Sequence, residues 1–174
     1  MSEHPASATL IHHHGPLLHL VLVAPQIPPN AGTLARTALA LRGRLHLIRP
    51  LGFRVDEASL RRAGLDYLEQ ASMVVHDSYA AFATSEPQAA AQAWFYSTRG
   101  TRLHWTATHA PGDALVFGSE THGLPPEMFD WIPPERLLKL AQPGDAVRSL
   151  NLACCATAAA YEALRQMMAG PVPM

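Results

Sequence analysis

Three short stretches of the sequence concentrate residue types that can do chemistry. The stretch SETHG holds an acid and a histidine two positions apart, Glu120 and His122, which could serve acid–base catalysis or bind a metal ion. The stretch RSLN offers the hydroxyl of Ser149 and the amide of Asn151. Arg36 follows a Pro-Pro-Asn stretch and carries a guanidinium that can hold a phosphate. Which chemistry is possible depends on how the surrounding helices and strands position these residues.

The spacing of the histidines and cysteines argues against a metal centre. None of the ten histidines, including the trio His12 to His14, shows an H-E-x-x-H or similar ligand spacing. The only two cysteines, Cys154 and Cys155, are adjacent and lack a second pair that could complete a zinc site. We therefore expect no metal.

Length and composition fit one folded domain. The chain has 174 residues, of which 48% are hydrophobic, enough for one sizeable core. We expect a flexible leader over 1–17 and a single domain over 18–170. The sequence has no run of 18 apolar residues, and its start lacks the pattern of a signal peptide. These features predict a cytoplasmic protein with no membrane partner.

The positive charges are concentrated in one part of the chain. Net charge is only -1, yet the segment 32–65 carries seven arginines against two acids, Asp56 and Glu57. Arginine suits phosphate binding, but a solvated arginine surface would give the same composition. The segment leaves both interpretations open.

Apolar runs predict strands that alternate with helices. We expect strands at 18–24, 44–50, 73–76, 93–97, 114–118 and 136–141. Helices are expected at 31–42, with Asn30 as N-cap and Gly43 as terminator, at 56–64, 78–91 and 126–132, and from Ser149 onward. Uniformly apolar strands that alternate with helices predict an α/β fold with a mostly parallel sheet and helices on both faces.

A parallel sheet places ligands beyond the carboxyl ends of its strands. The loops after Ala24, Ser97, Gly118 and Ala141 are therefore the places where a site is expected. Neither G-x-G-x-x-G nor G-x-x-x-x-G-K-[ST] occurs at these loops, which argues against a dinucleotide-binding unit and a P-loop ATPase.

Three stretches together resemble the motifs of the SPOUT-class RNA 2'-O-ribose methyltransferases. They are PPNAGTLAR (28–36), FGSETHGLP (117–125) and RSLNLACCATAAAYEA (148–163). A fourth, LRRAGLDYLE (60–69), resembles the signature of one subgroup, which methylates the wobble nucleotide (cytidine/uridine 34) of tRNA. Two alternatives are a knotted methyltransferase of another RNA, such as rRNA, and a knotted RNA-binding protein without catalysis. The presence of Asn30, Arg36, Glu120, Ser149 and Asn151 together argues against the second.

The resemblance implies features that residue spacing cannot show. Members of this class bind S-adenosylmethionine in a deep C-terminal trefoil knot and work as homodimers. The implied substrate is tRNA, bound through its anticodon stem-loop. Four residues match the cofactor contacts of the family: Tyr96, Gly118, Leu140 and Ser149. We expect Gly118 to let the backbone approach the adenine and ribose, and Leu140 to supply an apolar wall and a backbone amide.

The implied reaction asks mainly for positioning. A ribose 2'-hydroxyl attacks the sulfonium methyl group in line, which favours a dry and well-oriented pocket. Arg36 matches the family arginine that is usually proposed to activate this hydroxyl, as a general base. Because a guanidinium stays protonated and has no free acceptor, Arg36 could instead hold a phosphate and favour deprotonation by its charge. Asn151 is the second expected catalytic residue.

Three further residues are expected to support the site or to contact RNA: Asn30, Glu120 and Tyr161. Glu120 could bind a ribose, brace its loop, or simply be stabilised by the helix N-terminus that follows. Tyr161 matches a family tyrosine near the substrate, but it could equally be a core or dimer contact. His122 stands where many relatives carry arginine, and its role stays open.

The last loop departs from the family pattern. Here LAQPG replaces the usual IPM after the last strand and adds one residue. The alignment of 142–147 is therefore open, whereas Leu140 and Ser149 keep their matches.

Overall fold

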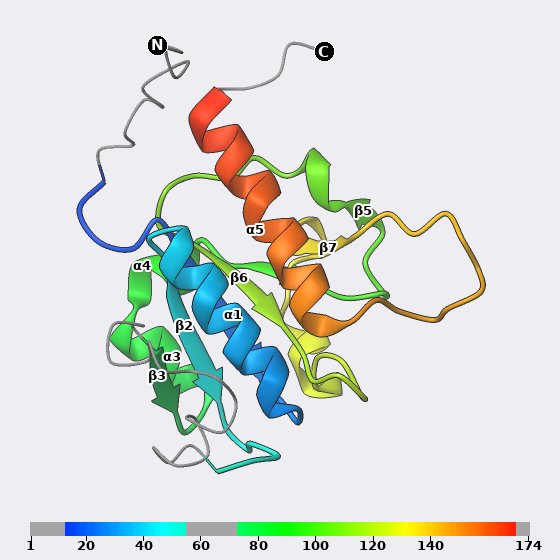
Figure 1. Cartoon of the computed structure of the whole chain (residues 1–174), viewed down its shortest axis with the longest axis horizontal. Coiled ribbons are helices and arrows are strands. Elements are labelled where there is room, and N and C mark those ends of the chain that lie inside the picture. The colour runs from blue at the N-terminus through cyan, green and yellow to red at the C-terminus, as the bar shows by residue number, and fades with distance from the viewer. Residues whose placement is uncertain (1–12, 55–72, 170–174) are drawn as a thin grey trace, which may run out of the picture.

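The computed structural model describes residues 13–54 and 73–169, and within them a seven-stranded sheet is the central feature. Its strands run in the order β3-β2-β1-β6-β4-β7-β5, and every neighbouring pair is parallel (Figure 1). The strands are β1 (Leu18–Val23), β2 (Arg44–Ile48), β3 (Met73–His76), β4 (Trp94–Tyr96), β5 (Arg102–Leu103), β6 (Asp113–Phe117) and β7 (Leu137–Lys139).

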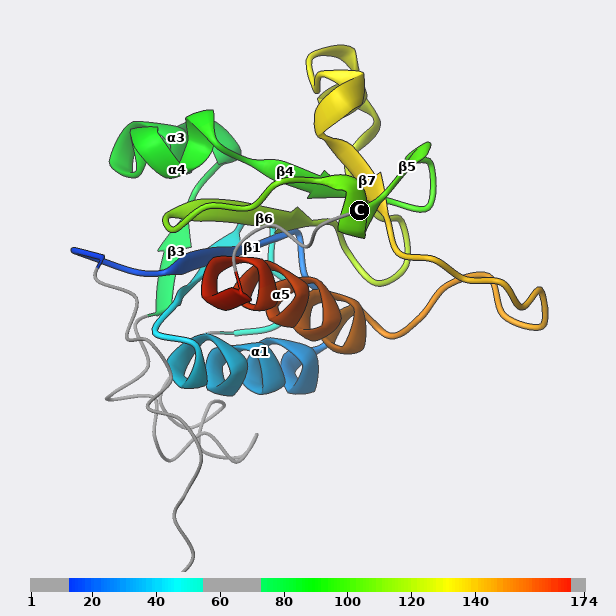
Figure 2. The same cartoon turned by 90° about the horizontal axis from the view of Figure 1, so that it is seen from above.

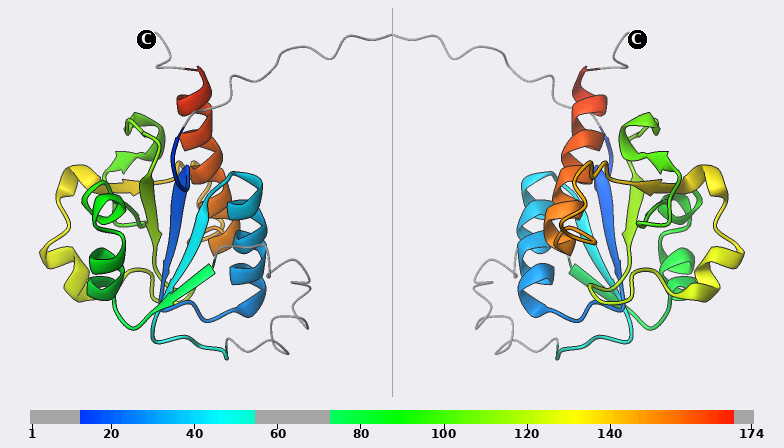
Figure 3. Two further views of the ribbon diagram at one scale, coloured as in Figure 1. Left: turned by 90° about the vertical axis from the view of Figure 1, so that its left-hand side faces the viewer. Right: turned by 90° about the vertical axis from the view of Figure 1, so that its right-hand side faces the viewer.

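Helices cover both faces of the sheet, as predicted. One face carries α1 (Pro28–Ala40) and α5 (Leu152–Ala169), which lie side by side (Figure 2). The other carries α3 (Tyr79–Ser85) and α4 (Pro87–Ala91), with the 3-10 helix η2 (Pro126–Asp130) on the same side (Figure 3). Two more 3-10 helices are η1 (His104–Thr106) and η3 (Pro134–Arg136).

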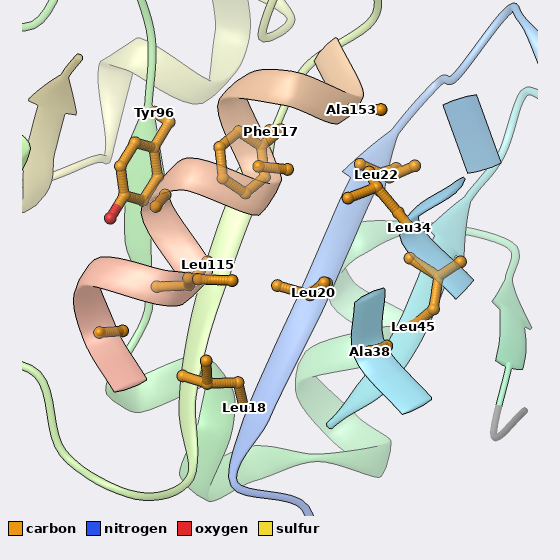
Figure 4. Close-up of a cluster of buried hydrophobic side chains, with 14 of the residues drawn as sticks. Leu18, Leu20, Leu22, Leu34, Ala38, Leu45, Tyr96, Leu115, Phe117 and Ala153 are labelled. Atoms are coloured by element: carbon orange, nitrogen blue, oxygen red, sulfur yellow. The ribbon is translucent and has the colours of Figure 1, made fainter. Parts of the chain in front are cut away.

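The central strands β1, β2, β4 and β6 are mostly apolar because both of their faces are buried. On β1 the residues Leu18, Leu20 and Leu22 point toward α1 and α5, where they join a cluster with small helix residues such as Ala38 and Ala153 (Figure 4). The alternate residues belong to a second cluster on the α3 and α4 face. Period-two alternation therefore sends neighbouring residues into two separate cores.

Helix α1 begins three residues earlier than predicted. Its N-cap is Ile27, and Pro28 and Pro29 occupy the first helical positions, where a missing N–H costs nothing. The prediction that Asn30 is the N-cap is wrong. The helix ends at Ala40, and Arg42, not Gly43, takes the left-handed conformation (φ 53°) that follows it.

Helix α5 begins at Leu152, so the prediction that it starts at Ser149 is also wrong. The side-chain oxygen of Asn151 accepts hydrogen bonds from the backbone N–H groups of Ala153 (2.8 Å) and Cys154 (3.2 Å). This is the geometry of an N-cap, which satisfies two donors that the first turn leaves without a partner.

Other predicted elements differ in length or type. The predicted helix over 78–91 is two short helices, α3 and α4, and the one over 126–132 is the 3-10 helix η2. The two-residue strand β5 was missed. The predicted helix over 56–64 and the subgroup signature at 60–69 lie outside the described residues.

The order of the strands places β7 between β4 and β5, although β4 and β5 follow each other in the chain. The segment that joins them crosses β7 closely: a Cβ on Gly100 would lie 2.6 Å from the backbone carbonyl of Leu138. Only glycine allows two backbones to approach in this way. This order is compatible with a C-terminal knot, and the knot itself stays a prediction. Among the described residues, no helix is both long and apolar enough to span a membrane.

Candidate active site

A pocket of about 1160 Å³ lies at the carboxyl ends of β4, β6 and β7. Six of the nine residues that the sequence singled out line it: Tyr96, Gly118, Glu120, Leu140, Ser149 and Asn151. They lie in or next to three of the four loops that the parallel-sheet argument pointed to. Asn30 lies behind this wall, whereas Arg36 and Tyr161 do not line the pocket.

The carboxylate of Glu120 joins the loop after β6 to the start of α1. It accepts hydrogen bonds from the backbone N–H groups of Gln26 (2.8 Å) and Ile27 (3.2 Å) and from the side-chain amide of Asn30 (2.8 Å). Since Ile27 is the N-cap of α1 and supplies no side-chain cap, the acid takes over that task from 93 residues away. Of the roles that the sequence allows for Glu120, these contacts correspond to bracing its loop.

The bracing continues from Asn30 to Asn151. Asn30 must donate its amide N–H to the carboxylate of Glu120, so its oxygen faces the amide of Asn151 at 3.1 Å. Asn151 in turn uses its oxygen to cap α5. These contacts fix the orientation of both amides. One hydrogen-bond chain therefore connects the N-termini of α1 and α5 through the three motifs.

Gly118 is a glycine for a reason that the sequence did not show. A Cβ at this position would lie 1.8 Å from the carbonyl carbon of Gly123 and 2.0 Å from the nitrogen of Leu124. The loop folds back on itself here, with paired hydrogen bonds of 2.9 Å between Ser119 and Gly123. The missing side chain makes room for the loop's own backbone, and the folded loop then forms part of the pocket wall.

Tyr96 lines the pocket, but its side chain belongs to the core cluster and only 5% of its surface is exposed. The ring stacks on Phe117 with centroids 4.7 Å apart, and the hydroxyl lies 3.5 Å from Nε2 of His109. Burial, reinforced by the negative charge of Asp113, raises the pKa of Tyr96. Tyr96 is therefore a neutral, aromatic part of the wall and not a proton donor at neutral pH.

The loop between β7 and α5 forms the open side of the pocket. Leu140 is partly buried and packs against the core cluster, whereas residues 143–151 are exposed. The segment with the uncertain alignment is tied by a hydrogen bond from the side-chain amide of Gln142 to the carbonyl of Val147. Ser149 lines the pocket from this loop, two residues before the cap of α5.

Arg36 and Tyr161 lie on the outer surface of the layer that α1 and α5 form. Both residues are exposed, Tyr161 with 52% of its surface accessible. The two helices are held together by a hydrogen bond between the hydroxyls of Thr37 and Thr157 at 3.2 Å. The expectation that Arg36 belongs to the site therefore does not hold for the pocket of its own chain.

Sequence reasoning missed several residues that line the pocket. Trp105 on η1 is 49% exposed, and the cations Arg99, Lys139 and Arg148 line the same cavity. The guanidinium of Arg99 lies 3.8 Å from the ring centre of Phe129. Exposed aromatics and cations that share one cavity are typical of sites that receive nucleotides. His122 also lines the pocket, but it is exposed and its backbone N–H, not its ring, holds the loop to Ser119.

The fold and the pocket together define a class of protein. A cavity at the carboxyl edge of a parallel α/β sheet, with apolar walls and a few fixed polar groups, is the usual design of a cofactor-dependent enzyme. Residues 17–161 match the model of the SpoU rRNA Methylase family. The chain therefore belongs to the SpoU methylase family.

Curated relatives and solved structures agree with this family. A tRNA (cytidine(34)-2'-O)-methyltransferase from Burkholderia ambifaria is 44% identical over 151 residues, 86% of this chain and 96% of its own. The protein of that name from Escherichia coli K12 is 40% identical over 152 residues, 87% of this chain and 94% of its own.

Two solved structures are relevant to the site. One, described as structural insights into the 2-OH methylation of C/U34 on tRNA, has a TM-score of 0.78 and 47% identity, and covers 88% of this chain and 98% of its own. The other is the SpoU methyltransferase AviRb of Streptomyces viridochromogenes in complex with AdoMet. It has a TM-score of 0.77 and 25% identity, and covers 95% of this chain and 64% of its own.

Proposed function

We propose that the protein is an S-adenosylmethionine-dependent methyltransferase that acts on the 2'-hydroxyl of the wobble nucleotide, cytidine or uridine 34, of tRNA. The hydrogen-bond chain from Glu120 through Asn30 to Asn151 is the observation that carries this proposal, because it assembles all three motifs around one pocket. The names of the relatives that match over most of their length support the substrate.

The residues of the pocket fit S-adenosylmethionine. The side chain of Leu140, which packs against the core that holds the stacked rings of Tyr96 and Phe117, gives an apolar wall for a nucleobase. The carboxylate of Glu120 places negative charge at the same cavity, which suits a cationic sulfonium. When bound, the cofactor supplies the methyl group. The chain's own task is then to exclude water and to orient the reacting ribose.

The cations of the pocket fit the RNA. Arg99, Lys139 and Arg148 can neutralise phosphates of the anticodon stem-loop and so hold the ribose in register. In this arrangement no side chain has to act as a strong base, because nearby positive charge stabilises the incipient alkoxide and the hydroxyl proton can pass to a substrate phosphate oxygen or to water at the mouth of the pocket.

A homodimer would explain the position of Arg36. This residue lies outside the pocket of its own chain, on a surface that also exposes Leu39 (39%), Tyr161 (52%) and Met168 (45%). Such apolar side chains on one helical layer favour self-association. Pairing of two α1 and α5 layers would bring Arg36 and Tyr161 of one chain toward the site of the other, where Arg36 holds a phosphate.

One assay tests the reaction. The protein is incubated with labelled S-adenosylmethionine and tRNA that lacks its wobble methyl group, and the modified nucleotide is mapped. Label at the 2'-oxygen of nucleotide 34 supports the proposal, whereas label only at another nucleotide, or no transfer at all, contradicts it.

A mixing experiment tests the shared site. Arg36→Ala and Asn151→Ala should each be inactive alone, but their mixture should regain roughly a quarter of wild-type activity, because half of the dimers then hold one intact site. A mixture that stays inactive while mixed dimers are detected would place Arg36 outside the partner's site.

A further inference from the structure

Three histidines from three neighbouring strands form a buried ladder far from the pocket wall. His19 on β1, His46 on β2 and His76 on β3 expose 5%, 0% and 7% of their surface. Nδ1 of His19 lies 2.9 Å from Nε2 of His46, and Nδ1 of His46 lies 2.9 Å from Nε2 of His76. The rings are stacked in sequence with centroids 5.1 Å apart. None of the three lines the pocket.

The tautomer of His46 decides what can bind between His46 and His19. A neutral imidazole has one N–H and one lone pair, so if His46 donates through Nδ1 to His76, its Nε2 presents a lone pair to His19. Between Nδ1 of His19 and Nε2 of His46 there must then be something electropositive, either a proton or a metal ion.

A carboxylate completes the group. One nitrogen of His19, one nitrogen of His46 and one oxygen of Glu86 all lie within 4.8 Å of one another. Oε1 of Glu86 accepts a hydrogen bond from Arg44 at 2.8 Å, which leaves Oε2 with acceptor capacity. Two imidazoles and a carboxylate are a donor set suited to zinc and similar divalent transition metals.

We propose that His19, His46 and Glu86 form a binding site for a divalent transition metal ion of the zinc type. The contact between His46 and His76 supplies what such sites need beyond their ligands, because a hydrogen bond at the second ring nitrogen fixes the tautomer and orientation of a ligating histidine. A water molecule would take the fourth position of a tetrahedral ion.

To accept the ion, the two rings must separate and tilt away from their hydrogen-bond line, and the carboxylate of Glu86, whose oxygen lies within 4.8 Å of both nitrogens, must close in. Zinc–nitrogen bonds of about 2.0–2.1 Å in a tetrahedral site set two ligand nitrogens roughly 3.3 Å apart, about 0.4 Å more than the hydrogen-bonded separation of these rings. In the tautomer that places the shared proton on Nδ1 of His19, this proton moves to Nε2, so the ring stays neutral and binds through the freed lone pair. His46 keeps its proton on Nδ1 and its bond to His76.

The site would act on stability and not on methyl transfer. It joins β1 and β2 to the start of α4, on the face of the sheet opposite α1 and α5. The ligands come from positions 19, 46 and 86, so no local spacing in the sequence could reveal them. The expectation of a metal-free protein was based on such spacing alone.

The test uses the full-length chain in a background that lacks the consecutive histidines His12 to His14. His12→Ala, His13→Ala and His14→Ala together remove a second possible ligand group from the N-terminus. After dialysis against chelator, Zn²⁺ and Mg²⁺ are titrated in parallel by calorimetry and thermal denaturation. We expect one Zn²⁺ per chain, a rise in Tm of roughly 5–10 °C at a hundredfold excess over the dissociation constant, and no effect of Mg²⁺.

Two variants and one spectrum identify the ligands. His19→Ala and Glu86→Gln should each weaken Zn²⁺ binding at least tenfold, whereas His104→Gln, a histidine outside the ladder, should not. Co²⁺ should give the intense visible absorption of a tetrahedral site in the background protein. The proposal is overturned if the background protein does not bind Zn²⁺ stoichiometrically, or if Glu86→Gln and His19→Ala bind Zn²⁺ as tightly as the background protein does. Because calorimetry, thermal denaturation and the Co²⁺ spectrum all use the protein without RNA, none of them depends on the proposed methyltransferase activity.

Discussion

The side chain of Asn30 lies between two partners that are 90 and 121 positions away in the sequence, Glu120 at 2.8 Å and Asn151 at 3.1 Å. Its amide donates to the first and its oxygen accepts from the second, so one residue joins the loop after β6 to the first turn of α5. The shape of the pocket therefore depends on one chain of hydrogen bonds that runs behind its wall.

Replacement of Glu120 by glutamine should therefore loosen the site. The carboxylate accepts three hydrogen bonds, and an amide in its place turns at least one of them into a contact between two donors. We expect a loss of stability of about 1.5–3 kcal/mol, with weaker S-adenosylmethionine binding. Denaturant unfolding and calorimetry would measure both. Glu127→Gln, an exposed acid on η2, is the control; equal behaviour of the two variants would contradict the bracing role.

Gly118→Ala should remove cofactor binding with little loss of fold. The new Cβ would lie 1.8 Å from the carbonyl carbon of Gly123, so the loop has to open. We expect an affinity for S-adenosylmethionine at least about 100-fold lower, since the wall of the pocket moves with the loop. Gly144→Ala is a matched control, because a Cβ there meets nothing within 4 Å. Tight binding by Gly118→Ala would show that the loop can shift without cost.

The strands and the location of the site could be predicted from the sequence because long apolar runs occur only where both sheet faces are covered. The carboxyl ends of such strands then had to carry the loops of the site. The two-residue β5 could not be predicted, since two residues carry no periodic signal. Its place at the sheet edge depends on its pairing with β7.

The starts of α1 and α5 were predicted wrongly because the group that caps each helix is not the one expected. The cap of α1 comes from a distant loop, and the cap of α5 lies two residues further along the chain than predicted. Asn30 and Ser149 are good local N-cap residues, but Glu120 reaches α1 from another loop and Asn151 caps α5. Local helix propensity gives no information about a carboxylate that lies 93 residues away in the sequence. The same holds for Arg36: its chemistry was readable from the sequence, whereas its place outside its own chain's pocket was not.

The pair of Glu162 and Arg165 should make α5 sensitive to acid. Hydrogen bonds from Arg165 lower the pKa of Glu162 to about 2. A depressed acid contributes stability that is complete above about pH 4.5 and is lost as the pH falls toward 2. Because the pair is partly exposed, we expect at most about 1 kcal/mol. Unfolding free energies of wild type and Glu162→Gln should differ at pH 7 and converge near pH 2; a constant difference would contradict this origin.

Trp105 should contribute to RNA binding and not to cofactor binding. Its ring is 49% exposed at the pocket, beside the cations that we assign to RNA phosphates, so a nucleobase of a single-stranded loop can stack on it. Loss of such a stack costs about 1–3 kcal/mol, and Trp105→Ala should raise KM for tRNA roughly 5- to 100-fold while the affinity for S-adenosylmethionine stays unchanged.

The matched control for this change is Trp131→Ala. Trp131 is 48% exposed, almost the same as Trp105, but it packs against Tyr79 and Phe95 and does not line the pocket. Trp131→Ala should change neither the KM for tRNA nor the affinity for S-adenosylmethionine by more than about twofold. Quenching of tryptophan fluorescence by an anticodon stem-loop should persist in Trp131→Phe and disappear in Trp105→Phe. If S-adenosylmethionine alone produces the Trp105-dependent quenching, the ring belongs to the cofactor subsite and the assignment to RNA is wrong.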